Sequence, residues 1–223
     1  KSLLFALSLT GREVKKSLSL EAALNKCTMK VFRPWAFQGS KNMKNYFEGW
    51  YFKHVSADRQ HVYSIIPGLS LSDDDGHSFV QLIDGLSGET FYYRYPLDSF
   101  RASGRVLSVE LEKSHFSDRG INLYLDDEQG LIRGELEYGP FGKYPGKLSS
   151  PGIMGWYSYV PLMECKHGIV STGHDIKGMI EVKGKTIDFS KGRGYIEKDW
   201  GKSFPESWIW LHCSPLIWEE LCA

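Results

Sequence analysis

Beyond residue 45, apolar and polar positions alternate over short stretches, as in β-strands that bury one face. Residues 61–71, 77–85 and 89–97 are rich in β-branched and aromatic side chains, and Gly, Asp and Pro stand between them. Residues 105–113 continue the alternation. No segment past residue 30 offers two clean turns of helical periodicity, so the pattern predicts an all-β chain.

Two stretches predict β-hairpins. Residues 121–139 form two apolar runs around the turn sequence DDEQG, and residues 178–190 repeat the form around Lys-Gly-Lys at 183–185. Short strands with polar turns between them indicate a β-barrel or sandwich. Residues 138–150 carry Gly, Pro and Lys without alternation, and we interpret them as a junction between two β units.

Composition and charge exclude several classes of function. The 223 residues carry 27 Lys and Arg against 27 Asp and Glu, and the scattered basic residues give no electrostatic surface for nucleic acid. The four cysteines show no metal-type spacing, and no apolar run approaches the ~20 residues that cross a bilayer. The apolar run LLFALSL lacks a cleavage site after it, which argues against secretion and favours the cytoplasm.

The first chemical candidate is NYFEGWYFKH at residues 45–54. Alternation along a strand places Glu48, Trp50, Phe52 and His54 on one face. If that face lines a cavity, a carboxylate and an imidazole stand in an aromatic wall. The alternative is that Trp50 and Phe52 are plain core and that Glu48 is ion-paired at the rim of a barrel.

The second candidate is YIEKDW at residues 195–200. Alternation places Tyr195, Glu197 and Asp199 on one face, with the two carboxylates within about 7 Å of each other. Neighbouring like charges and apolar surroundings would raise one carboxyl pKa and make a proton donor. The alternative is a solvent-facing acidic edge. We favour the donor because the acids lead directly into an aromatic run that contains Trp208 and Trp210.

Two further segments have more ordinary interpretations. GIMGWYSYVPLMECKHG, at residues 152–168, is nearly free of charge and predicts either a buried strand or the lip of a pocket. His167 lies near its end, and His174 and Asp175 follow it, but their spacing matches no metal motif and indicates hydrogen-bonded structural residues. His174 could also serve as a polar cavity residue. We therefore expect no metal site and no cofactor.

Four segments together resemble the tocopherol cyclase family, its bacterial members more closely than the plant enzymes. They are YFEGWYFK (46–53), PGIMGWYSYVP (151–161), GHD (173–175) and GYIEKDWGKSFPESWIW (194–210). The likeness runs from about Val31 to Cys213. It implies an all-β, lipocalin-like fold of two related halves around an apolar cavity, with residues 29–145 as the first half and 146–213 as the start of an incomplete second half. Residues 1–28 and 214–223 have no counterpart in the pattern.

For the plant enzymes the resemblance implies a cyclisation without a redox cofactor. A proton adds to a prenyl double bond, and the phenolic oxygen of a hydroquinone attacks the tertiary cation to close a chromanol ring. Residue chemistry then suggests Glu197, Asp199, Glu48 and Tyr195 as catalytic residues. The expected substrate-binding residues are Trp50, Phe52, Trp156, Tyr157, His174, Trp200, Trp208 and Trp210.

Two other functions remain open on the sequence. A lipocalin-like carrier would bind a lipid or isoprenoid without chemistry, and a hydratase would add water to an alkene in the same cavity. In each case the expected partner is a hydrophobic small molecule, with peripheral membrane contact open and the oligomeric state undetermined.

Overall fold

The fold is one antiparallel β-sheet. The structure, a computed structural model, describes residues 30–72, 74–161, 163–204, 206, 207 and 209. Within them twelve strands pair in the order β4-β3-β2-β1-β12-β10-β9-β8-β7-β6-β5, and β11 pairs with β10 beside this path. The predicted all-β class is confirmed. Among the described residues, no helix is long and apolar enough to cross a membrane.

The strand bounds follow the predicted alternation closely. The strands are β1 (Tyr46–Val55), β2 (Val62–Leu71), β3 (His77–Asp84), β4 (Thr90–Tyr95), β5 (Phe100–Ala102), β6 (Ser108–Leu111), β7 (Ser114–Ser117), β8 (Gly120–Leu125), β9 (Ile132–Tyr138), β10 (Cys165–Val182), β11 (Lys185–Asp188) and β12 (Gly192–Gly201). Both predicted hairpins are present, as β8–β9 and β10–β11. Two 3₁₀ helices, η1 (Leu97–Ser99) and η2 (Gly155–Tyr159), lie in the loops.

The two ranges assigned to separate halves contribute to this single sheet. Strands β10 and β12 lie between β1 and β9 in the hydrogen-bonded order, so residues after 145 fill the middle of the sheet that residues 46–138 begin. The junction predicted at 138–150 is a loop, as expected, but it leads back into the same sheet. Trp208, Trp210 and the segments 1–28 and 214–223 lie outside the described residues.

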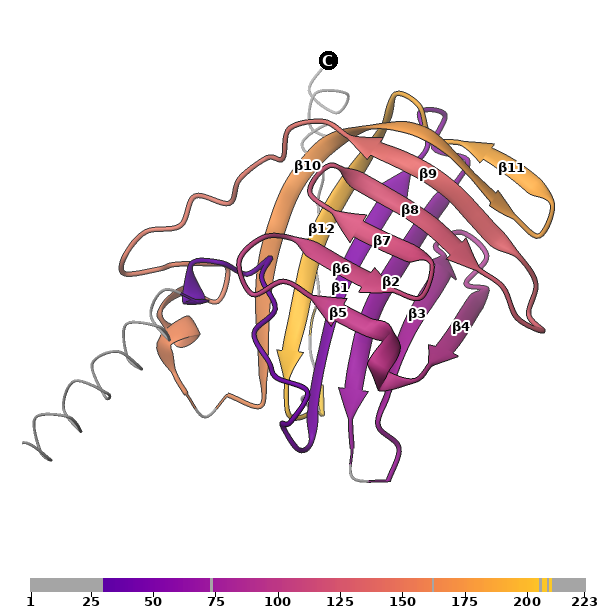
Figure 1. Cartoon of the computed structure of the whole chain (residues 1–223). Helices are drawn as coiled ribbons and strands as arrows, with labels where there is room; N and C mark the ends of the chain where they lie inside the picture. Colours follow the sequence, from indigo (N-terminus) through magenta and orange to yellow (C-terminus); the bar gives the residue numbers. More distant parts are fainter. Residues whose placement is uncertain (1–29, 73, 162, 205, 208, 210–223) are drawn as a thin grey trace, which may run out of the picture.

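The sheet curls until its two ends face each other. In Figure 1, strands β5 to β8 cross in front of β1 to β3, and an apolar core fills the space between them. Rings meet across that space: Phe52 lies 5.6 Å from Phe116, and Trp50 lies 6.4 Å from Phe100, between ring centroids. The sheet is not closed by backbone pairing, since β4 and β5 are its ends.

The exposed edge of β4 is covered by a side chain. The amide of Gln129, in the β8–β9 turn, accepts from Tyr92 N at 3.1 Å and donates to Tyr92 O at 2.9 Å. The Tyr93 hydroxyl donates to the backbone oxygen of Gly130 at 2.7 Å. A glutamine therefore satisfies the backbone groups that a neighbouring strand would otherwise bond, and it protects the edge from pairing with another chain.

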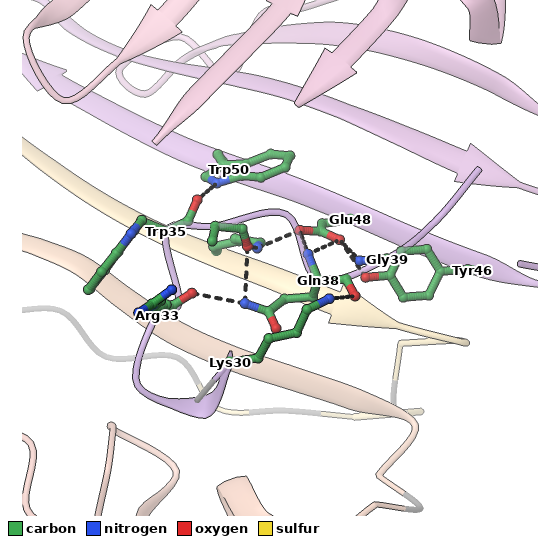
Figure 2. A network of polar contacts seen from close by, with 10 residues as sticks. Lys30, Arg33, Trp35, Gln38, Gly39, Tyr46, Glu48 and Trp50 are labelled. Atoms are coloured by element: carbon green, nitrogen blue, oxygen red, sulfur yellow. Dashed lines mark hydrogen bonds and ion pairs between the residues drawn. The ribbon is translucent and has the colours of Figure 1, made fainter. Parts of the chain in front are cut away.

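The predicted two-face pattern of β1 is confirmed, and its inward face holds an ion pair (Figure 2). Glu48 is fully buried and forms an ion pair with Lys198 of β12, which is also fully buried. Glu48 accepts hydrogen bonds from the backbone N–H of Gln38 and Gly39, at 2.9 and 3.0 Å, and from the Tyr46 hydroxyl. Burial lowers the pKa of Lys198 to about 8, although the charge of Glu48 opposes that shift.

The lysine of this pair is fully coordinated. Its ammonium group donates to the Ala36 backbone oxygen and lies over the rings of Trp50 and Trp200, at 4.5 and 4.9 Å from their centroids. Two buried charges are stable in such a place only when every donor and acceptor is satisfied. Of the two interpretations of Glu48, a cavity wall or an ion pair, the structure shows the ion pair. It lies in the interior of the barrel and not at the rim.

The ion pair holds residues 30–39 against the sheet. The segment receives hydrogen bonds at its backbone from Lys198, Trp50 and Gln38, and it gives two N–H groups to Glu48 (Figure 2). Gly168 of β10 permits the close approach, because a Cβ at that position would lie 2.5 Å from Cβ of Pro34.

We expect the two charges to be strongly coupled in stability. Glu48→Gln or Lys198→Met alone should each lower the free energy of unfolding by about 3–5 kcal/mol, since each leaves one buried charge uncompensated. The double variant should lose clearly less than the sum. Urea unfolding of all four proteins measures the coupling. The exposed pair Lys177–Glu137 is the control, with a coupling of less than about 1 kcal/mol. Additive losses at 48 and 198 would contradict the interpretation.

Candidate functional site

A second polar cluster lies on the opposite face of β12. Tyr195, Glu197 and Asp199 share that face, as their alternation predicts, and the register pairs Glu197 with Tyr51 of β1. The Tyr195 hydroxyl donates to Glu197 Oε2 at 2.6 Å. Glu48 points the other way, because it stands on the face of Trp50 and Lys198. The structure thus brings Tyr195, Glu197 and Asp199 together and separates Glu48 from them by the thickness of the sheet.

His167 of β10 completes this cluster. Its Nδ1 lies 2.8 Å from Asp199 Oδ1, and its Nε2 lies 3.7 Å from Glu197 Oε2. Desolvation lowers the pKa of His167, but the hydrogen bond to Asp199 and the charges of Asp199 and Glu197 outweigh it and leave the pKa raised. Burial and the Glu197 carboxylate raise the pKa of Tyr195, which keeps its phenol protonated. We refer to Tyr195, Glu197, Asp199 and His167 as the acid–imidazole cluster.

A large pocket opens beside the cluster. Its volume is about 1020 Å³, and its walls come from residues 30–38, the loop at 105–107, the β9–β10 loop and the ends of β10 and β12. Figure 1 shows the segment from residue 30 beside the β9–β10 loop and η2, at the side of the barrel. Aromatic and apolar side chains dominate the lining, among them Phe32, Trp35, Phe141, Met154, Met163 and Trp200. His167 is the member of the acid–imidazole cluster that lines it.

The pocket lies along a gap in the strand ladder. β9 pairs with β10 only at residues 176–182, and no described strand pairs with residues 165–171 on that edge. The β9–β10 loop returns to β10 through Gly142, which exchanges backbone hydrogen bonds with residues 172 and 173. Met154 reaches the edge itself, with its sulfur 3.0 Å from His167 N. An unpaired stretch of β10 therefore forms one wall of the pocket.

Comparisons with known proteins show what the chain is similar to. The sequence profile of the family described as Tocopherol cyclase-like matches residues 117–220, a range just under half of the chain that contains the whole acid–imidazole cluster. This part of the chain is similar to the tocopherol cyclase-like family. A probable chloroplastic tocopherol cyclase of Oryza sativa subsp. japonica is 35% identical over 60 residues, and the chloroplastic tocopherol cyclase of Zea mays is 33% identical over 60 residues. Each alignment covers 27% of this chain and 13% of the relative.

Three solved structures are similar at low identity. A putative AttH protein of Nitrosomonas europaea has a TM-score of 0.43 at 13% identity, with 72% of this chain and 53% of that chain covered. CghA has a TM-score of 0.46 at 7% identity, with 71% and 46% covered. Kievitone hydratase from Nectria haematococca has a TM-score of 0.36 at 8% identity, with 70% and 48% covered.

The aromatic residues that were predicted to bind substrate lie in three places. Trp50 and Phe52 are fully buried in the barrel core, and Trp200 lines the pocket. Trp156 and Tyr157 of η2 are exposed and stack on each other at 4.1 Å between centroids. The segment at residues 152–168 was predicted to be either a buried strand or the lip of a pocket. The structure shows the lip, since Met154, Ser158 and Tyr159 line the pocket.

His174 stands inside the barrel, away from the acid–imidazole cluster. Its Nδ1 lies 2.9 Å from the Ser171 hydroxyl, and its ring lies 4.5 Å from that of Tyr138. Tyr138 in turn bonds Nε2 of His54 at 2.6 Å. Gly194 separates the two histidines across the sheet, and a Cβ there would lie 2.2 Å from His174 Nε2.

Sequence reasoning missed two residues that matter most to the arrangement. The spacing of His167 matches no metal motif, and its partners on β12, more than thirty positions along the chain, are not visible in the local sequence. Lys198 has no predicted role, although alternation along YIEKDW places it on the face of Trp200. The signal for Lys198 was present in the strand pattern. The signal for His167 required the register between β10 and β12. The described residues hold no group of three or more potential metal ligands.

The buried histidines should make the fold sensitive to acid. Burial, with the neighbouring His174, lowers the pKa of His54 to about 3, and burial, with Arg193, lowers that of His174 to about 4. Both rings are therefore neutral in the folded chain at pH values where the unfolded chain protonates them. Their contribution to stability is complete above pH ~6.5 and falls by about 1.4 kcal/mol per histidine for each pH unit below it.

His174→Gln should flatten this pH dependence. Urea unfolding between about pH 7 and pH 5 measures the slope, which should decrease by the contribution of one histidine. His115→Gln, at an exposed position of β7, is the matched control and should leave the slope unchanged. An equal slope in His174→Gln and the unsubstituted chain would show that His174 is not held neutral.

Proposed function

We propose that the chain binds a prenylated hydroquinone or related isoprenoid in the pocket and cyclises it by proton donation from the acid–imidazole cluster. The observation that carries the proposal is the position of His167. It lines an apolar pocket and at the same time bonds one carboxylate and lies near a second. The similarity of residues 117–220 to the tocopherol cyclase-like family supports the reaction class.

Glu197 is the donor that we favour. Its side chain is 7% exposed, against 31% for Asp199, so water has less access to its carboxyl group. Tyr195 fixes one oxygen of Glu197, and Asp199 holds the imidazole of His167 in place. In this assignment Tyr195, Asp199 and His167 are positioning residues, and the reacting double bond enters beside His167.

The reaction balances without an oxidant or reductant. The carboxyl proton adds to the prenyl double bond and leaves a tertiary cation. The phenolic oxygen attacks that cation, and the phenolic proton returns to the carboxylate, so the product has the mass of the substrate. Aromatic walls stabilise the cation, and Trp35, Phe141 and Trp200 supply such faces here. Exclusion of water prevents hydration of the cation.

Binding without chemistry is the second candidate function. The observation in its favour is that Glu197 and Asp199 are not among the described residues that line the pocket. A carrier would use the apolar walls alone, and the acid–imidazole cluster would then stabilise the β10–β12 pairing. Glu48 has no part in either proposal as a base, because its carboxylate faces the barrel core and is paired with Lys198.

We expect Glu197→Gln to abolish turnover and preserve binding. Loss of a general acid costs about 10²–10⁴-fold in rate, whereas the amide keeps the shape of the side chain and an acceptor for Tyr195. Incubation with a prenylated hydroquinone followed by mass analysis distinguishes a product of equal mass from one heavier by a water, which would indicate hydration.

Glu181→Gln is the control. Glu181 is a carboxylate of β10 that pairs with Arg133 and lies outside the pocket lining, so its loss should leave turnover intact. Undiminished turnover in Glu197→Gln would reject the donor assignment. Ligand binding with no product in any of the proteins would establish the carrier function instead.

The pH dependence of turnover should identify His167. Its pKa is raised, so the imidazole is protonated at and somewhat above the ordinary value of about 6.5. As pH rises through the raised pKa, the cluster loses a proton and the rate should fall. His167→Gln keeps a donor for Asp199 but cannot titrate, and its profile should lack this alkaline decline. The same decline in both proteins would exclude His167 as its source.

A further inference from the structure

Basic side chains surround the apolar pocket. The cationic residues in its lining are Lys30, Arg105, Lys143, Lys166 and Lys202. The only described carboxylate in the lining is Asp118. The whole chain carries equal numbers of acidic and basic residues, so this excess of positive charge belongs to the pocket and not to the composition.

These cations lack acidic partners within the described part of the chain. Lys30 Nζ donates to the Gln38 backbone oxygen at 2.8 Å, and Lys166 Nζ donates to the Ser158 backbone oxygen at 3.1 Å. Both acceptors are neutral carbonyls, so neither hydrogen bond pairs the ammonium group with an opposite charge. Arg105, Lys143 and Lys202 are exposed at the mouth and form no ion pair with a described carboxylate.

The half-buried lysines stand where polar and apolar surfaces meet. Lys166 lies on the same face of the sheet as Trp200, its register partner on β12, and both line the pocket. Lys30 begins the segment that contributes Phe32 and Trp35 to the same wall. A volume of about 1020 Å³ is at the upper end of the range for ligand pockets, which leaves room for a long chain beyond the cations.

We propose that the pocket takes an amphipathic anion, a long isoprenoid or acyl chain that ends in a carboxylate or phosphate. The acidic head lies against Lys166 and Lys30, and the chain extends along the aromatic wall. This inference goes beyond the proposed function, because a prenylated hydroquinone carries no carboxylate or phosphate and the two ligands share only the pocket. Charge-assisted hydrogen bonds to the two ammonium groups would fix the orientation of the chain relative to His167.

Paired charged and neutral probes test the head group. Displacement of a fluorescent fatty acid by palmitate or palmityl alcohol, and by farnesyl diphosphate or farnesol, compares ligands with equal chains. We expect each acid to bind at least about ten-fold more tightly than its alcohol, the scale of one hydrogen bond to a charged group. The larger of the two acid-to-alcohol affinity ratios identifies the head group as carboxylate or phosphate, because each ratio compares ligands with the same chain.

Lysine variants locate the effect. Lys166→Met keeps the aliphatic stem, and should weaken the acids about ten-fold while leaving the alcohols unchanged. Arg105→Met, at an exposed position, tests the mouth if Lys166→Met disturbs folding. Lys147→Met, in the β9–β10 loop but outside the lining, is the control and should change nothing. Addition of salt should weaken the acids selectively.

Each outcome decides the proposal. Equal affinity for acids and alcohols, unaltered by either variant, overturns the anionic head group and leaves the apolar pocket of the proposed function in place. Absence of binding by all four probes overturns this inference, while the proposed function is decided separately by turnover of a prenylated hydroquinone. Loss of alcohol and acid binding together in Lys166→Met would show that the lysine supports the pocket instead of contacting the ligand, and would also overturn the assignment.

Discussion

The structure depends on two opposite charges buried in the barrel. Glu48 and Lys198 stand on adjacent strands, fully enclosed, and the backbone of residues 36–39 satisfies the remaining donors and acceptors of both. An uncompensated charge there would cost several kcal/mol, so the N-terminal segment must remain in place for the pair to be stable. The same segment forms a wall of the pocket. The pocket therefore depends on the buried ion pair. Glu48, a residue with the chemistry of a catalytic acid, has a structural role in this fold.

Strand alternation then determines where the chemistry can occur. β1 and β12 carry polar side chains on both faces, and the register allows no contact through the sheet. The inner face holds the ion pair and two neutral histidines, and all four side chains are buried away from water. The outer face holds two carboxylates with an imidazole between them. Both arrangements reach the pocket, the ion pair through its partners Tyr46 and Gln38 and the outer cluster through His167. The outer cluster reaches it with an imidazole that bonds a carboxylate.

Much of this was predictable, because it depends on alternation alone. The strands, both hairpins and the residues that share a face within each strand follow from a period of two. The placement of Glu48 and Glu197 on opposite faces, although the sequence grouped both as catalytic, requires the register between β1 and β12. What the pattern cannot give is register between distant strands. His167 meets Asp199 only because β10 pairs with β12 in one alignment, and Glu48 meets Lys198 only because β12 inserts beside β1. The two predicted halves likewise form one sheet because β10 and β12 pair with strands that are distant in the sequence, and the local sequence does not reveal such pairing.

The position of the pocket follows from an interruption of that pairing. β10 is eighteen residues long, but β9 covers only its C-terminal part, so the N-terminal part keeps one edge without a described strand. A paired edge would place a further strand where the pocket lies. Because the β9–β10 loop covers this edge only in part, His167 is at once a member of the sheet and a wall of the pocket. In this fold, the acid–imidazole cluster and an apolar ligand can come together where the pairing of the strands is incomplete. In the rest of the described sheet, side chains of the core fill the interior.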